Sequence, residues 1–135
     1  MSALLGQWRP ETARFDFVVA GAPLPLSWRQ AHEKVETVAD RAGLPLGISP
    51  NETYPLCHAA LDPGDAILIF TDGLVETRNS QAEMFGTARV EAILQERGSE
   101  GAEAIKANLL AGLHEFLHGK SPQDDVTFLV LKRWD

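Results

Sequence analysis

Asp65-Ala-Ile-Leu-Ile-Phe-Thr-Asp-Gly-Leu-Val-Glu-Thr-Arg78 is the most strongly patterned segment of this 135-residue chain. It follows the turn Asp62-Pro-Gly64, whose residues either fix φ or leave it free where a chain reverses direction. Residues 66–70 are then apolar without interruption. A run of that length is too short to span a membrane and fits a buried strand. The segment therefore predicts a core strand that ends at Thr71-Asp72-Gly73.

Asp72 has two interpretations from these residues alone. A carboxylate at the tip of a buried strand, beside a glycine, is held rigidly and can be approached closely, as a metal or phosphate-handling site requires. The alternative is an Asp-Gly turn between two strands, because this dipeptide is a strong short-range hairpin signal.

Composition limits the class of protein. A length of 135 residues predicts one domain with its own core, and the apolar fraction of 44% is that of a globular protein. The net charge of −7 disfavours nucleic acids and anionic membranes as partners, and it suits a site that gathers divalent cations. Cys57 is the single cysteine, so no internal disulfide forms, and the first residues lack a secretory signal. These features predict a soluble, cytoplasmic protein.

The chain before residue 65 predicts strands at residues 14–20, 24–28, 34–38 and 53–60, from their alternating or apolar patterns. A helix over residues 29–41 is an alternative to the third of these strands. Residues 1–13 predict only a mixed segment that ends in a turn.

The chain after residue 78 changes to a helical period. Residues 87–97 predict a helix with Thr87 as its N-cap, and a longer helix runs from about residue 100 to 118, where Gly119 ends it. Residues 126–131 are β-branched and apolar and predict a final strand. Strands, then two helices, then a strand predict an α+β fold with the helices packed on one sheet face.

A second acidic position, Asp124-Asp125, directly precedes the last strand. If the strands after Asp65 and before Lys132 are antiparallel neighbours, Asp72 and Asp124 lie at the same edge of the sheet. Carboxylates gathered there repel each other unless a cation sits between them, and such oxygen-rich sites suit Mg²⁺ or Mn²⁺. The alternative is an acidic, solvated loop at the start of a strand.

Residues 63–79 resemble the metal-dependent protein phosphatase (PPM) family, in its bacterial SpoIIE/RsbU branch. Four further pieces fit this family in order, namely Ala20-Gly-Ala-Pro23, Gly43-Leu-Pro-Leu-Gly47, Met84-Phe-Gly86 and Gln123-Asp-Asp-Val-Thr127. The resemblance extends from about Glu11 to Lys132. Several motifs in the right order favour the site interpretation of Asp72 over the hairpin turn.

The resemblance implies a layered β-sandwich with packed helices that removes phosphate from phosphoserine or phosphothreonine on proteins. It implies two Mn²⁺ or Mg²⁺ ions that activate a bridging water. By the same resemblance Asp72 and Asp124 are catalytic metal ligands, Asp125 is a further candidate ligand, and Gly73 permits a tight turn. The implied substrates are phosphorylated anti-anti-sigma proteins of stress or sporulation signalling, and an upstream sensor or receiver domain is an expected partner in the full-length protein.

Two departures from the family pattern qualify this expectation. The family's first metal motif, an Asp followed shortly by Gly-His-Gly, has no match in residues 1–13, where Glu11 is the one acid. The branch often has Asn-Ala-Gly-His where this chain has Val19-Ala-Gly-Ala22. Residues 1–135 are therefore expected to form the C-terminal portion of one phosphatase domain, with little activity alone. The competing hypothesis is a regulatory or protein-binding module that keeps the fold without the catalysis.

His114-Glu-Phe-Leu-His118 matches the His-Glu-x-x-His pattern of zinc proteases, which places both imidazoles on one helix face. A catalytic zinc needs a third protein ligand, and no His, Glu or Cys follows His118. The expectation is therefore that these histidines bind no zinc and that Leu113, Phe116 and Leu117 pack into the core.

Overall fold

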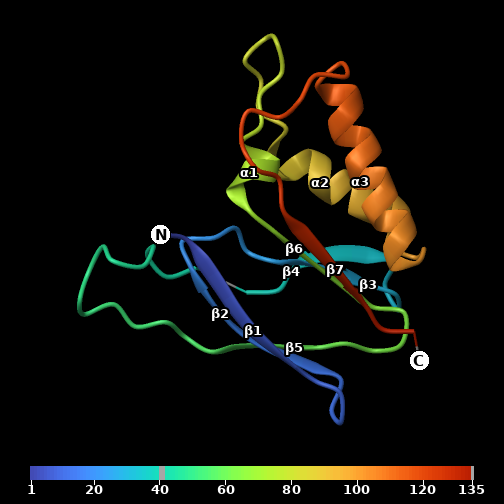
Figure 1. Ribbon diagram of the computed structural model, residues 1–135. Helices are drawn as coiled ribbons and strands as arrows, with labels where there is room; N and C mark the ends of the chain where they lie inside the picture. Colours follow the sequence, from blue (N-terminus) through green and yellow to red (C-terminus); the bar gives the residue numbers. More distant parts are fainter. Residues whose placement is uncertain (40–41, 135) are drawn as a thin grey trace.

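The computed structural model describes residues 1–39 and 42–134 and consists of three layers (Figure 1). Two antiparallel sheets lie face to face, and two helices cover the outer side of one of them. The strands are β1 (Ala3–Arg9), β2 (Arg14–Ala20), β3 (Leu26–Arg29), β4 (Lys34–Thr37), β5 (Cys57–Ala60), β6 (Ala66–Phe70) and β7 (Phe128–Lys132). The helices are α1 (Asp72–Val75), α2 (Gly86–Arg97) and α3 (Ala102–Phe116).

The first sheet has the order β1-β2-β5 and the second has the order β4-β3-β6-β7. In the second sheet β6 pairs with β3 on one side and with β7 on the other, and both pairings are antiparallel. The β6–β7 register ends at the pair Phe70↔Phe128. The chain segments beyond these two residues therefore meet at one edge of the sheet.

β6 is buried on both faces, which explains its uninterrupted apolar sequence. Ile67 packs against the first sheet, with Phe15 and Phe17 of β2. Ala66 and Leu68 belong to the cluster that the second sheet shares with α2 and α3. The prediction of a core strand at residues 66–70 is confirmed.

Each of the two long helices packs one of its faces against the second sheet. Val90 and Leu94 of α2, and Ile105 and Leu109 of α3, are fully buried against it. The predicted pair of helices is confirmed, but α2 begins at Gly86 with Phe85 as its N-cap, so the N-cap assigned to Thr87 is wrong. No helix within residues 1–39 and 42–134 has the length and apolar character needed to cross a membrane.

The predictions for the chain before residue 65 need three corrections. Residues 3–9 form β1, which pairs with β2 from Ala3↔Ala20 to Arg9↔Arg14 although no strand was expected there. The strand predicted at residues 53–60 is reduced to β5, because Pro55 cannot donate to a ladder. The helical alternative for residues 29–41 is wrong where it can be tested, since β3 and β4 form a hairpin, and residues 40 and 41 lie outside the described part.

Candidate functional site

Asp72 lies where β6 passes into the single turn α1. Thr71 is the N-cap, with φ −95° and ψ 165°, and Asp72 is the first helical residue. The amide of Leu74 donates to the Thr71 carbonyl at 3.1 Å, and the amide of Glu76 donates to the Asp72 carbonyl at 2.8 Å. The Asp-Gly pair therefore opens a helical turn, and the hairpin alternative is wrong.

Asp124 and Asp125 lie on the loop that leads from α3 into β7. Because β6 and β7 are antiparallel neighbours, as expected, this loop runs beside α1 (Figure 1). Asp72, Asp124 and Asp125 all line one cavity of about 630 Å³. The structure therefore places the three predicted ligand positions along the lining of one cavity, at one edge of the second sheet.

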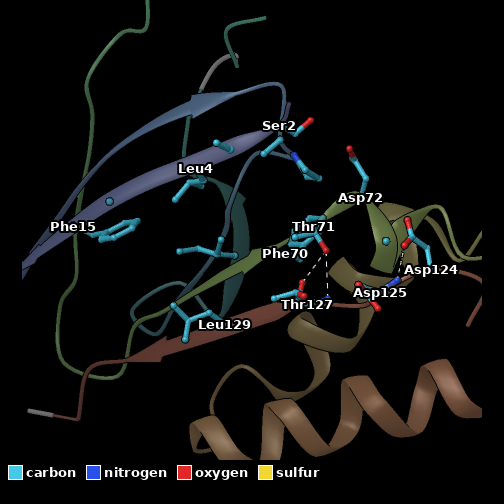
Figure 2. Close-up of a pocket in the computed structure, with 16 residues that line it drawn as sticks. Ser2, Leu4, Phe15, Phe70, Thr71, Asp72, Asp124, Asp125, Thr127 and Leu129 are labelled. Atoms are coloured by element: carbon cyan, nitrogen blue, oxygen red, sulfur yellow. Dashed lines mark hydrogen bonds between the residues drawn. The ribbon is translucent and has the colours of Figure 1, made fainter. Parts of the chain in front are cut away.

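The cavity has an acidic end and an apolar end (Figure 2). Its polar lining comes from Ser2, Thr71, Thr127 and the three aspartates, and its apolar lining includes Leu4, Phe15, Ile69, Phe70 and Leu129. Both sheets contribute, because Leu4 and Phe15 belong to the first sheet and the others to the second. Such a cleft, mostly apolar with a few convergent polar groups, is typical of a binding site.

The three carboxylates do not form one cluster. Figure 2 shows the Asp125 side chain pointing away from Asp72. The Asp125 amide donates a 2.7 Å hydrogen bond to Asp124 Oδ1, so this residue supports Asp124 through its backbone. Among the described residues, no group of three or more His, Cys, Asp or Glu side chains could hold a metal ion. The carboxylate donors Asp72 and Asp124 suit a hard cation, but a pair of ions needs more of them.

Two close backbone contacts hold the acidic segments together. Thr71 donates to the Thr127 carbonyl from its amide at 3.0 Å and from its hydroxyl at 3.2 Å. A Cβ on Gly73 would collide with the backbone carbonyl oxygen of Asp125. Gly73 is not among the glycines with positive φ, so close packing, and not the expected tight turn, requires a glycine here.

Two other positions bear on the missing ligands. Ala22, at the position where the branch often has histidine, lines the cavity, and its methyl side chain offers no ligand atom. Glu11, the one acid of residues 1–13, lies in the turn between β1 and β2 and does not line the cavity. Neither residue completes the metal site.

The sequence did not predict that β1 contributes to the wall of the cavity. Ser2, Ala3, Leu4 and Gly6 form one wall of the cavity, yet no strand was expected there. It also gave no role to Thr71 and Thr127, although both lie inside the motifs that carried the resemblance. Their position directly beside the predicted ligands was the one available indication.

The His114–His118 motif does not have the geometry that a zinc site needs. α3 ends at Phe116, and His118 has a φ of 51°, so the two histidines are not on consecutive turns of one helix. Leu113 and Leu117 are buried, and Phe116 packs against the same core, as expected.

Comparison with known proteins agrees with this architecture. The family model described as Stage II sporulation protein E (SpoIIE) matches residues 1–134. Protein IcfG of Synechocystis is 29% identical over 94 residues, which cover 67% of this chain and 14% of IcfG.

Two solved structures are similar over nearly the whole chain. The structure of the RsbU and RsbW domains of Rv1364c from Mycobacterium tuberculosis is 28% identical with a TM-score of 0.75, over 98% of this chain and 36% of that one. The SiaA-PP2C domain of Pseudomonas aeruginosa is 20% identical with a TM-score of 0.79, over 99% of this chain and 51% of that one. This chain thus spans from about a seventh to half of the length of these relatives. The chain belongs to the SpoIIE family, in the SpoIIE/RsbU branch of the PPM phosphatases, and has the fold of part of a PP2C-type phosphatase domain.

Proposed function

We propose that residues 1–135 are the C-terminal portion of a phosphatase domain that removes phosphate from phosphoserine or phosphothreonine of a signalling protein of the anti-anti-sigma type. One observation carries the proposal. Asp72, after β6, and Asp124, before β7, line the same cavity in a chain of this family. The likeness to a structure that contains RsbU and RsbW domains supports a role in the same kind of signalling.

In this proposal Asp72 and Asp124 hold Mn²⁺ or Mg²⁺. Two such ions would supply an activated water for in-line attack at phosphorus. The chain's own residues prepare the site. The hydrogen bonds between Thr71 and Thr127 fix the two acidic segments, and the Asp125 amide orients the Asp124 carboxylate.

A second candidate function is a non-catalytic regulatory or protein-binding module with the same fold. The shortage of ligands favours it, because no group of three or more metal-binding side chains occurs in residues 1–39 and 42–134. The two functions differ in what an upstream segment would add. In the first, that segment supplies the missing carboxylate, whereas in the second no segment does so.

The test is phosphate release from a phosphoserine-containing protein with added Mn²⁺. We expect little turnover from the 135 residues alone and Mn²⁺-dependent turnover from a longer protein that carries an Asp-x-x-Gly-His-Gly segment upstream. Asp72→Asn in that protein should abolish turnover without changing its circular dichroism spectrum. Asp62→Asn, at an exposed carboxylate beyond the opposite end of β6, is the control and should have no effect.

Full turnover by the 135 residues alone would show that the upstream ligand is dispensable. A longer protein that is folded but inactive with Mn²⁺ would favour the non-catalytic module.

A further inference from the structure

Gln123 joins two segments that are far apart in the sequence. Its side-chain oxygen accepts a hydrogen bond from the Arg78 amide at 3.1 Å, and its side-chain nitrogen donates to the Arg78 carbonyl at 2.8 Å. One side chain thus satisfies both backbone groups of a residue 45 positions away. The pair joins the loop that carries Asp124 to the segment that leaves α1.

The Arg78 side of this pair is firmly anchored. The preceding residue, Thr77, is buried, and its hydroxyl donates to the Gly73 carbonyl at 2.6 Å. The Thr77 carbonyl also accepts a 2.8 Å hydrogen bond from the amide of Phe85, a residue that is only 1% exposed. Gln123 therefore ties a solvent-exposed loop to a segment that is anchored in the core through the preceding residue, Thr77.

Apart from the Asp125 carbonyl, which packs on Gly73, the described part of the loop that Gln123 ties down has few attachments near Asp124. Residues 121–125 are all exposed, and the Thr71–Thr127 hydrogen bonds lie beyond them, next to β7. The bond from the Asp125 amide to Asp124 is internal to the loop, so it orients the carboxylate without placing the loop. Gln123 is adjacent to Asp124, and its two hydrogen bonds fix this loop to the segment after α1, in addition to the contact between the Asp125 carbonyl and Gly73.

We infer that Gln123 is a positioning residue that holds Asp124 beside Asp72, so that both carboxylates can bind one cation. The inference rests on the function proposed above. It differs from that proposal in assigning the affinity of the site to a residue that contacts neither the cation nor the substrate. Groups that fix the orientation of metal ligands typically change the metal affinity by about 10–100-fold when they are removed, and Gln123 would act in this way through the position of the loop.

The chain contains a matched control for this contact. Gln95, on α2, accepts from the Val35 amide at 3.1 Å and donates to the Glu33 carbonyl at 2.7 Å. It is an exposed glutamine with the same pair of backbone hydrogen bonds, but it holds the β3–β4 hairpin. Methionine at either position keeps the length of the side chain and removes both bonds.

The experiment is a titration of the ¹⁵N-labelled chain with MnCl₂, followed by paramagnetic broadening of the amide resonances next to Asp72 and Asp124. In the unsubstituted chain we expect Gly73 and Asp125 to broaden together. In Gln123→Met, broadening should require about tenfold more Mn²⁺ or more, whereas Gln95→Met should behave like the unsubstituted chain. Exchange of the Arg78 amide with deuterium, measured without metal, should be faster in Gln123→Met alone.

The outcomes separate the inference from the proposed function. If Gly73 and Asp125 broaden together in the unsubstituted chain and equally in Gln123→Met, the positioning role is wrong and the cation site stands. If they do not broaden in the unsubstituted chain, the cation site itself is wrong, and the positioning role falls with it. Equal losses of affinity in Gln123→Met and Gln95→Met would indicate a general loss of stability and would also contradict the inference.

Discussion

Gly73 is a single residue that allows the two acidic segments to pack directly against each other. It lies in α1, next to Asp72, and the backbone carbonyl of Asp125 occupies the space that a side chain would need. The Thr-Asp-Gly motif marked this glycine in the sequence, but its physical reason was not visible there. The reason is a contact with a residue more than fifty positions away, which no local pattern encodes.

Gly73→Ala should destabilise the chain and displace the loop around Asp125. Alanine is the better helix former by about 1 kcal/mol, but overpacking against a backbone atom typically costs about 1–3 kcal/mol. We therefore expect a net loss in the free energy of unfolding by urea, together with shifted amide resonances for Asp124 and Asp125. An unchanged or higher stability with unchanged resonances would show that the loop does not pack on Gly73.

Asp65 is a second residue whose role depends on distant contacts. It is 1% exposed and accepts hydrogen bonds from the Gln30 amide at 2.8 Å, the Arg29 guanidinium at 2.9 Å and the Asp62 amide at 3.0 Å. Burial alone would raise the pKa of this carboxyl, but these hydrogen bonds and the charge of Arg29 together lower it. The ionised form is therefore the one that stabilises the fold.

In Asp65→Asn, the free energy of unfolding should decrease less than in the unsubstituted chain as the pH is lowered into the acid range. Because the pKa of Asp65 in the folded chain lies below its usual value of 3.8, its contribution is present above that pH and is lost as the pH falls through the lowered value. The measurement is urea unfolding at a series of pH values between neutral and strongly acidic. The exposed Asp62→Asn is the control, and an equal acid dependence in Asp65→Asn and the unsubstituted chain would contradict the assignment.

At the scale of whole elements, β6 and β1 show what the sequence can and cannot predict. β6 is buried on both faces, so its apolar run predicts it without reference to any neighbour. β1 carries Leu5, which is 75% exposed, and Gly6, which lies over the Phe15 ring. β1 therefore has no alternating pattern of its own, and its pairing with β2 makes it a strand.

The candidate site, like the strands, was predicted from the sequence in part, and the rest was seen only in the structure. The order of the motifs and the antiparallel pairing of the last strands predicted that Asp72 and Asp124 lie at one sheet edge. The contacts that hold them there, from Thr71 to Thr127 and from Gln123 to Arg78, join residues 45 to 56 positions apart. Local periodicity carries no information about such contacts, so they required the structure.

The left-handed backbone conformation at the end of α3 can be tested by substitution. His118 follows the C-cap Leu117 and has a φ of 51°, in the left-handed region that favours glycine. His118→Gly should therefore raise the free energy of unfolding by about 1 kcal/mol. His114→Gly, within the helix, is the control and should lower it by a similar amount. A loss of stability in His118→Gly would show that the His118 side chain contributes more than its backbone strain costs.

At the scale of the whole molecule, the cavity depends on the packing of the two sheets. β1 and β2 supply one wall, β6 and β7 supply the other, and the acidic residues lie where the second sheet ends. The two sheets share a core that includes Phe17 and Ile67, both nearly inaccessible to solvent. A change that separates the sheets would therefore alter the site even without touching an aspartate.

The central claim is that Asp72 and Asp124 share one cation, and anomalous scattering from crystals soaked in MnCl₂ tests it most directly. The account predicts one strong peak in the anomalous difference map, within about 2–2.5 Å of a carboxylate oxygen of each residue. Crystals of Asp72→Asn, treated in the same way, should lose that peak while the fold is unchanged. The absence of a peak in the unsubstituted chain, or a peak that touches only one of the two carboxylates, would contradict the account.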